Sequence, residues 1–341
     1  MLLSIVIPFF NTFDRSESLR HIIKRTLTEN KDIEFILVND GSVDSTFSKL
    51  INYYKEFSKS SCLKIIDQEN KGPGGARNNG LKNATGKYIW FVDSDDNIDI
   101  SNAYERLKQA IELDVNFDFI DFNIRENNKI TNSMGNVESG YYPSFENKYL
   151  DLGRIVTKIF CRDVFIINNV TYPEKVIYED NYLIYILPIF LNNFFKFNDA
   201  VYEYVENQNS ITRQKFNRKY YDRLLTSYEG LENHYYLNNK KIEEGVLVRF
   251  NEIFYENTLL YIIGGILKGE IDKRELMEVK KIIEWCNFLK KKYNFKFIIS
   301  NKRSFKIKIL FEIIYILSIF FGSKDWYSYF LNLNKEEWKI K

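Results

Sequence analysis

Short apolar runs alternate with amphipathic stretches through residues 1–125 of the chain. The runs are rich in Ile, Val and aromatic residues and nearly continuous in apolarity, which is typical of strands buried on both faces. Strands are predicted at Leu2–Pro8, Ile33–Asn39, Leu63–Asp67, Tyr88–Asp93 and Phe117–Phe122. Helices are predicted between them at about Ser16–Leu27, Ser45–Ser58, Gly75–Ala84 and Ser101–Leu113. This alternation predicts an α/β fold with a mostly parallel central sheet that is covered by helices.

The pattern changes beyond the fifth predicted strand. Residues 126–153 are polar, rich in Asn and Gly and poorly periodic, which predicts a loop or a small insertion. Later the periodicity is helical, and helices are predicted at Lys219–Leu237, Glu243–Ile266, Asp272–Lys292 and Lys306–Phe321. We therefore expect an α/β domain over residues 1–215, in two parts at about 1–125 and 126–215, followed by a C-terminal helical region over residues 216–341.

The composition excludes several classes of protein. The 341 residues include 45% hydrophobic and 28% charged residues, and the net charge of +2 gives no overall basic field for nucleic-acid binding. The three scattered cysteines match no zinc or redox spacing and suit a reducing compartment. The N-terminus lacks the basic region and the cleavage site of a signal peptide, so a cytoplasmic location is expected. No uncharged apolar stretch reaches the length of about 18 residues that a membrane span needs.

The segment Phe305–Gly322, "FKIKILFEIIYILSIFFG", comes nearest to a membrane-active sequence. It is interrupted by Lys306, Lys308 and Glu312, and the basic "NKRS" precedes it. A buried C-terminal helix fits this pattern, and so does a basic amphipathic helix that lies on the inner face of the membrane. Self-association through the C-terminal helices, which would give a homo-oligomer, is a further alternative.

Unusual polar residues follow four of the predicted strands. The blocks are "PFFN" (Pro8–Asn11), "NDGSVDST" (Asn39–Thr46), "ENKGPGGARNNG" (Glu69–Gly80) and "WFVDSDD" (Trp90–Asp96). Ligands bind outside the carboxyl ends of the strands in open α/β sheets, so the four blocks are expected to border one site. Several carboxylates at the end of a buried strand are costly unless a positive charge compensates them.

The third block combines glycines with a cation just after the predicted helix start. Arg77 is predicted in the first turn of that helix, where a cation is unfavourable unless an anion lies between it and the helix dipole. Glycines that allow close approach of the backbone, together with Arg77, make a diphosphate cradle plausible. The alternative is a Gly-rich turn with a solvated arginine. The block matches neither the Walker loop nor the GxGxxG pattern.

The fourth block is a cluster of hard oxygen ligands. Asp93 and Asp95 lie two positions apart and could project their carboxylates towards one divalent cation. Such a site suits Mg²⁺ or Mn²⁺, and substrate phosphates and water usually complete it. The alternative is an aspartate-rich turn or a helix cap, and Asp96 or Asp99 could cap the helix near Ser101.

Taken together, the blocks resemble the family 2 glycosyltransferases of GT-A fold. The segments that carry the resemblance are "SIVIPFFN", "FILVNDGSVDST", "NKGPGGARNNGL", "GKYIWFVDSDD" and "YPEKVIYEDNYL", within roughly residues 3–210. The resemblance implies an inverting enzyme that transfers a sugar from a UDP-sugar to an acceptor glycan or lipid-linked saccharide, as in the synthesis of bacterial surface polysaccharides. It further implies a nucleotide-sugar half at about residues 1–125 and an acceptor half at about 126–215.

The resemblance also assigns residues to the donor. The implied donor-binding residues are Pro8, Phe10, Asn11, Asp40, Asn70, Gly72, Arg77, Asp93 and Ser94. Asp40 would hydrogen-bond the uracil, and Arg77 would lie near the base or the diphosphate. Asp95 would bind a Mn²⁺ or Mg²⁺ ion that bridges the phosphates, and Asp93 would contact the ribose or the metal.

A second element, "VIYEDNYLIYIL", would supply the proton chemistry. By resemblance Asp180 is the general base for the acceptor hydroxyl, and Glu179 and Asp96 would face the acceptor. Taken alone, the pair Glu179–Asp180 before an apolar helix is only a favourable N-terminal charge. The sequence departs from the family at the block Val201–Arg213, which lacks the histidine that many relatives use as a metal ligand.

Two other functions compete with this interpretation. A nucleotidyltransferase would be expected to place a glycine-rich phosphate loop after the first strand, but "PFFNTFDRSES" contains no glycine. A non-catalytic, sugar-nucleotide-binding partner subunit is the other alternative, and the presence of Asp95 and Asp180 argues against it.

Overall fold

The computed structural model describes residues 1–135, 137–144, 152–205, 219–239, 241–242, 246 and 250. The chain divides into two compact units, Met1–Gln214 with Leu225–Val246 and Lys215–Leu224 with Leu247–Lys341. Most of the predicted C-terminal region, including Phe305–Gly322, lies outside the described residues and stays a prediction. Within the described ranges, no helix is long and apolar enough to cross a bilayer.

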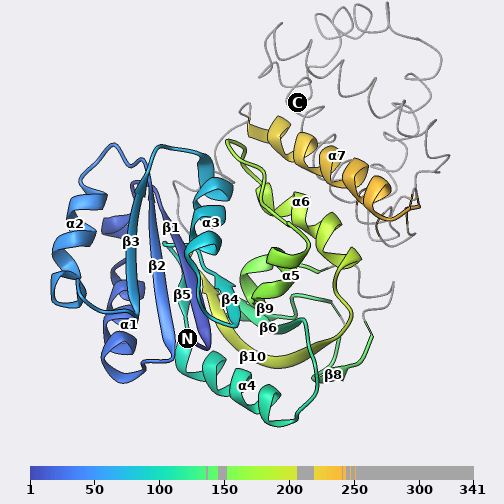
Figure 1. Ribbon diagram of the computed structural model, residues 1–341, viewed down its shortest axis with the longest axis horizontal. Coiled ribbons are helices and arrows are strands. Elements are labelled where there is room, and N and C mark those ends of the chain that lie inside the picture. The colour runs from blue at the N-terminus through green and yellow to red at the C-terminus, as the bar shows by residue number, and fades with distance from the viewer. Residues whose placement is uncertain are drawn as a thin grey trace, which may run out of the picture. The chain divides into compact units, whose positions relative to one another are not determined.

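A twisted sheet forms the centre of the first unit (Figure 1). Its strands are β1 Leu3–Phe9, β2 Ile33–Asp40, β3 Leu63–Gln68, β4 Tyr88–Phe91, β5 Asn97–Ile98, β6 Phe119–Glu126, β7 Lys129–Thr131, β8 Gly140–Tyr142, β9 Lys158–Cys161 and β10 Phe194–Tyr204. The strand order is β3-β2-β1-β4-β9-β6-β10-β5, with β7 beside β6 and β8 beside β10. Strands β3, β2, β1 and β4 are parallel neighbours, and β6 is parallel to β10. Antiparallel β9 joins β4 to β6.

Helices cover both faces of this sheet (Figure 1). They are α1 Glu17–Glu29, α2 Thr46–Tyr53, α3 Gly72–Asn83, α4 Ile100–Glu112, α5 Arg162–Ile167 and α6 Glu179–Ile186. A further helix, α7 Lys219–Leu237, contacts α6 through His234 and Tyr185. Alternate residues of β1 enter opposite cores: Ile5 packs with α1 and α4, and Val6 packs with α3, α5 and α6. Burial on both faces explains the continuous apolar runs, and the predicted α/β fold with a mostly parallel sheet is confirmed.

Most predicted elements are present within a few residues of their expected bounds, and α7 coincides with the helix predicted at Lys219–Leu237. The polar segment 126–153, predicted as a loop or a small insertion, contains the short strands β7 and β8. One prediction was wrong. Helix α3 begins at Gly72 and not at Gly75, so Arg77 lies in the second turn of the helix and not in the first. The argument from the helix dipole therefore does not apply to Arg77, because the dipole acts mainly within the first turn.

The buried carboxylate of Glu34 fastens the edge of the sheet opposite the carboxyl ends of β1 and β2. Its Oε1 accepts hydrogen bonds from Ser4 Oγ at 2.7 Å, Thr85 N at 2.6 Å and Thr85 Oγ1 at 2.7 Å. Its Oε2 lies 3.1 Å from Lys64 Nζ. Burial raises the pKa of Glu34, but the hydrogen bonds and Lys64 outweigh burial, so the pKa lies below its ordinary value. Glu34 thus ties β1, β2 and β3 to the turn before β4.

A buried ion cluster joins the strands of the second half of the sheet. Asp121 on β6 lies 2.7 Å from Lys158 Nζ on β9 and 2.8 Å from Lys196 Nζ on β10, and none of these three side chains is exposed. Ser133 and Thr157 donate further hydrogen bonds to the same carboxylate, at 2.6 and 2.9 Å. The cluster satisfies the buried charge, which would be costly if it were unpaired. The cluster therefore joins β6 to its two neighbours, β9 and β10.

The first turns of α3 pack against the segment that precedes α6. A Cβ atom at Gly74 would lie 2.1 Å from the carbonyl oxygen of Pro173, so only glycine fits there. Asn78, one turn further, clamps Tyr172: its Nδ2 donates to Tyr172 O at 2.9 Å and its Oδ1 accepts from Tyr172 N at 2.9 Å. The room left by Gly72 and Gly74 is therefore filled by protein backbone.

We expect Glu34→Gln to lower the free energy of unfolding at about pH 7 by about 2–4 kcal/mol, because it removes a buried charge that Lys64 and the surrounding donors stabilise. A carboxylate whose pKa is lowered by folding contributes stability above its unfolded pKa, and this contribution is lost as the pH falls through the folded value. The difference between wild type and variant should therefore shrink below about pH 4. Urea unfolding at several pH values measures it. Glu105→Gln, which removes an exposed pair with Lys108, is the control. Equal stability of Glu34→Gln and wild type at pH 7 would contradict the assignment.

We expect Gly74→Ala to destabilise the protein by about 1–3 kcal/mol, because the added methyl group displaces the backbone of Pro173. Thermal or urea unfolding measures the loss. Lys82→Ala, at an exposed position of the same helix, is the matched control and should change stability little. A Gly74→Ala protein as stable as the Lys82→Ala protein would show that α3 and the Tyr172–Pro173 segment do not pack closely.

Candidate functional site

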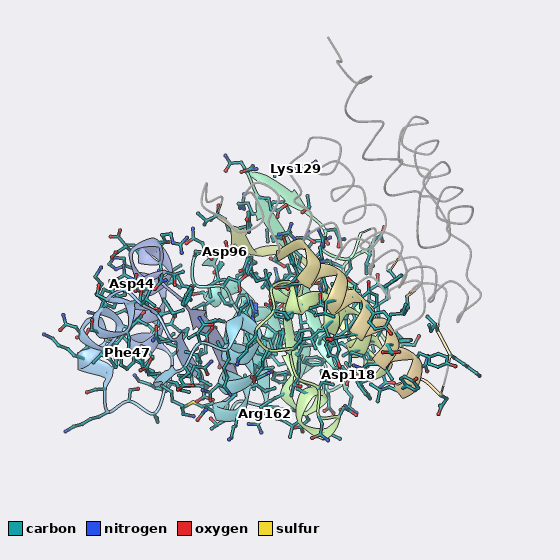
Figure 2. All side chains as sticks on the ribbon, turned by 90° about the horizontal axis from the view of Figure 1, so that it is seen from above. Asp44, Phe47, Asp96, Asp118, Lys129 and Arg162 are labelled. Atoms are coloured by element: carbon teal, nitrogen blue, oxygen red, sulfur yellow. The ribbon has the colours of Figure 1, made fainter. Side chains whose placement is uncertain are left out.

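The loops that follow β1, β2 and β4 meet at one edge of the sheet, because these parallel strands are neighbours. In Figure 2, Asp44 of the loop after β2 and Asp96 of the turn after β4 lie on the same side of the view, and Asp118 and Arg162 lie on the other side. Three of the four sequence blocks thus end beside one another, and the fourth follows β3, which pairs with β2. The structure brings the predicted blocks together.

Side-chain hydrogen bonds tie these loops to each other. Asn11 has a left-handed backbone, with φ of 53°, and its Oδ1 accepts from the backbone N–H groups of Val43 at 3.0 Å and Asp44 at 3.3 Å. The hydroxyl oxygens of Thr12 and Ser94 lie 2.8 Å apart. Asn11 and Ser94, both predicted to bind the donor, therefore hold the loops in register with one another.

Asp40 is a buried carboxylate at the end of β2. Its Oδ1 accepts from Gln68 Nε2 at 2.7 Å and from the backbone N–H of Lys71 at 2.8 Å. Asn70 donates to the backbone oxygen of Asp40 at 2.9 Å. Phe10, after β1, is 45% exposed although it is aromatic. A fixed carboxylate and an exposed ring thus lie at the ends of neighbouring strands.

Pro8 and Gly72, also predicted to bind the sugar donor, contact other parts of the protein backbone. Pro8 lies inside β1, opposite Val38 of β2, and is half-buried. Gly72, with φ of 78°, begins α3, and a Cβ atom there would lie 3.2 Å from the backbone nitrogen of Lys175. Its contact is therefore with the segment before α6.

The aspartates after β4 form a turn that leads into β5. Asp95 is half-buried, and burial together with the neighbouring Asp93 raises its pKa. Asp96 is buried; its Oδ2 accepts from the hydroxyl of Tyr202 at 2.5 Å and its Oδ1 from the backbone N–H of Val205 at 2.9 Å. Burial and Asp93 raise the pKa of Asp96 to about 8. Asp96 thus connects the turn to the end of β10, and its predicted contact with an acceptor stays a prediction.

Of the two residues proposed as caps for the following helix, Asp99 is the one that caps α4, where its Oδ1 accepts from the backbone N–H of Asn102 at 3.1 Å. The capping alternative therefore does not account for Asp93, Asp95 or Asp96.

Arg77 lies beneath this turn and is 7% exposed. Its Nη2 lies 2.5 Å from Asp93 Oδ1, and its Nη1 pairs with Glu179 Oε1. Its guanidinium carbon lies 5.4 Å from the centre of the Tyr172 ring. Burial alone would lower the pKa of Arg77, but Asp93 and Glu179 raise it well above its ordinary value. Arg77 is therefore a buried cation between two acids, and not a solvated one.

Glu179 and Asp180 are the first two residues of α6. Burial raises the pKa of Glu179 to about 7, although Arg77 opposes this shift. Asp180 is half-buried, whereas Glu179 is buried. The geometry thus separates the two acids, because Glu179 faces Arg77 inside the protein and Asp180 is the more accessible of the pair.

Sequence reasoning missed two residues at this site. Arg15, at the end of the short helix Phe13–Arg15, is exposed; it donates to Asn11 O at 3.3 Å and lies close enough to Asp95 to oppose the rise of its pKa. Tyr172 lies against Arg77 and, at 5.2 Å between ring centres, against Phe91. The position of Arg15 just after the first strand block was a usable signal, whereas nothing local marks Tyr172.

The residues present fit a divalent cation that takes most of its ligands from elsewhere. Across the described positions, no three His, Cys, Asp or Glu side chains gather as a metal cluster. Asp93 and Asp95 nevertheless offer hard oxygen ligands, and their mutual repulsion favours a bound cation. Mg²⁺ and Mn²⁺ commonly bind one or two protein carboxylates and complete their shell with phosphates and water.

Several proteins of known family are similar to this chain. Cholesterol galactosyltransferase of Borreliella burgdorferi is 28% identical over 222 residues, which are 57% of this chain and 59% of that protein. Poly(ribitol-phosphate) beta-glucosyltransferase of Bacillus spizizenii is 41% identical over 101 residues, 29% of this chain and 15% of that protein. The matched regions thus span less than two thirds of these relatives.

Solved structures show the same fold. Residues 1–349 of S. aureus TarS, in complex with UDP-GlcNAc, superpose with a TM-score of 0.61 at 20% identity, over 85% of this chain and 81% of that one. The model of the family described as Glycosyl transferase family 2 matches residues 4–168, which contain β1 to β4 and the aspartate turn. This region, just under half of the chain, therefore resembles the family 2 glycosyltransferases, and the chain has the GT-A fold.

Proposed function

We propose that the chain is an inverting glycosyltransferase that transfers a sugar from a UDP-sugar to an acceptor glycan or lipid-linked saccharide. The observation that carries the proposal is the meeting of the aspartate turn after β4 with the two acids that begin α6, joined by Arg77. Two relatives are named as a galactosyltransferase and a glucosyltransferase, and S. aureus TarS was crystallised with UDP and with UDP-GlcNAc. These names support the donor class.

The donor nucleoside would lie between the ends of β1 and β2. Asp40, held by Gln68 and Lys71, would accept a hydrogen bond from the uracil N–H, and the exposed ring of Phe10 would contact the base or the ribose. Arg15, exposed beside Asp95, would contact the diphosphate, because its guanidinium suits bidentate phosphate binding.

Asp95, with Asp93, would hold a Mn²⁺ or Mg²⁺ ion. When bound, the ion would neutralise charge on the leaving diphosphate. Asp93 also pairs with Arg77, so its carboxylate is oriented before any ligand arrives. Such prior orientation of charged groups is an efficient source of stabilisation in enzyme sites.

Asp180 would act as the general base that takes the proton from the acceptor hydroxyl. Its position at the start of α6, more accessible than Glu179, suits contact with an acceptor. A single displacement, with the acceptor oxygen attacking from the face opposite UDP, inverts the anomeric carbon. Glu179 faces Arg77, so its role is to orient α6.

The proposal extends to the biosynthetic process and the cellular location of the protein. Synthesis of a bacterial surface glycan fits relatives named for transfer to poly(ribitol-phosphate) and to cholesterol. The protein would act in the cytoplasm or on the inner face of the membrane. The C-terminal helices, outside the described residues, would provide the membrane contact or join two copies of the chain.

We expect wild-type protein with Mn²⁺ to release UDP from at least one donor in a panel of UDP-sugars. Asp180→Asn should slow this release by about 10²–10⁴-fold, because it removes the general base without changing shape. Asp95→Ala should reduce it to a similar extent by removing a metal ligand. Asp114→Asn is the matched control, because Asp114 is exposed and its φ of 50° suits asparagine.

The assay also separates the alternatives. Equal UDP release by wild type, Asp180→Asn and Asp95→Ala would contradict the catalytic assignments. Formation of UTP and sugar 1-phosphate when pyrophosphate is added to the UDP-sugar, in place of UDP release, would indicate nucleotidyl transfer. Donor binding without release from any member of the panel would indicate a non-catalytic partner subunit.

A further inference from the structure

We propose that Arg77 is a positioning residue, which holds the start of α6 against the aspartate turn and so sets the place of Asp180, and that it is not a donor ligand. This inference rests on the proposed function only in naming Asp180 as the base. It departs from the expectation that Arg77 contacts the base or diphosphate of the donor.

Both terminal nitrogens of the Arg77 guanidinium are already bound to acids of the protein. One nitrogen pairs with Asp93 from the turn after β4, and another pairs with Glu179 from the first turn of α6. The side chain is 8% exposed, and the ring of Tyr172 lies beside the guanidinium. A group that is buried between two acids and an aromatic ring is poorly placed to meet a diphosphate.

The start of α6 depends on contacts of this kind. Tyr178, the residue before the helix, has a left-handed backbone with φ of 66°, which is unfavourable for a bulky residue. Such a conformation persists only where the surrounding structure enforces it. The bond from Arg77 to Glu179 acts immediately after Tyr178, and the clamp of Asn78 on Tyr172 acts six residues before it.

Helix α3 therefore carries a holding face, which we define as Gly74, Arg77 and Asn78. Gly74 allows the backbone of the preceding segment to approach, Asn78 fixes that segment, and Arg77 fixes the first residue of α6. Helix α3 follows β3 in the donor half, and Arg77 on it contacts both the aspartate turn after β4 and the start of α6. The holding face therefore fixes the position of Asp180 relative to the aspartate turn. A lysine could not replace Arg77, since a single ammonium lacks the fork that spans two carboxylates.

The test compares Arg77→Gln and Arg77→Lys with wild type. We expect kcat for UDP release or sugar transfer to fall at least about 30-fold in both variants, while the Kd for UDP with Mn²⁺ changes less than about threefold. In Arg77→Gln the acid limb of the kcat–pH profile should also move to higher pH by about half a unit or more, because this variant removes the cation that favours ionised Asp180, whereas Arg77→Lys keeps a positive charge. A merely structural role would not move this limb.

A second readout needs no activity. Hydrogen exchange at the backbone of Glu179–Leu183 should accelerate at least about tenfold in Arg77→Gln, because the start of α6 loses its anchor. Arg106→Gln is the matched control, because Arg106 on α4 forms an ion pair of 2.9 Å with Asp199 on β10. This substitution should leave both kcat and hydrogen exchange in α6 unchanged. If Arg77→Gln does not fold, Glu179→Gln removes one ion pair only and should show the same fall in kcat and the same faster exchange to a smaller extent.

The outcomes decide between the two assignments. A UDP Kd weakened about tenfold or more with unchanged kcat and unchanged exchange in α6 would make Arg77 a donor ligand and overturn the proposal. Unchanged kcat, Kd and exchange would overturn it as well. Wild-type protein that releases no UDP would contradict the proposed function, and the exchange experiment would still decide whether Arg77 holds α6.

Discussion

The buried pairing of Arg77 with Asp93 and Glu179 is the interaction on which the site depends. It joins the turn after β4 to the first residue of α6, which lies far from it in the sequence. Removing one partner from such a cluster would leave an uncompensated charge in a buried place, which is costly. The same cation keeps Asp93 and Glu179 close together although both are acids, and Asp180 follows directly. Acids that would otherwise repel one another are thereby held at one edge of the sheet.

The rest of the fold serves to keep that edge fixed. Glu34 fastens the opposite edge of the parallel strands, and Asp121, with Lys158 and Lys196, fastens β9 between the two parallel groups. Within each of these clusters the acid is paired with lysine. Asp95, by contrast, is half-buried, and burial and Asp93 raise its pKa. Asp95 thus stores unfavourable electrostatic energy that a bound cation would relieve. Perturbed acids of this kind gather at functional sites.

The strands could be predicted because burial on both faces leaves a continuous apolar run, as in β2, all of whose residues are buried. The aspartate turn could be predicted because its charges begin where such a run ends. The start of α3 was misplaced because its glycines suggested a loop, although Pro73 near the helix start was a signal for the earlier beginning. The partners of Arg77, and of Asp96 with Tyr202, lie far apart in sequence, and no local pattern specifies such tertiary pairs. Residue type thus indicated which groups belong to the site, but not which of them face each other.

The proposed function requires a nucleoside diphosphate to bind where β1, β2 and β4 end, with a divalent cation on the aspartate turn. Calorimetric titration of UDP into the wild-type chain and into Asp40→Asn, each with and without Mn²⁺, tests it most directly. We expect Mn²⁺ to tighten binding at least about tenfold, and we expect Asp40→Asn to weaken it by about tenfold through loss of a hydrogen bond to a charged group. UDP binding that responds to neither the metal nor the substitution would contradict it.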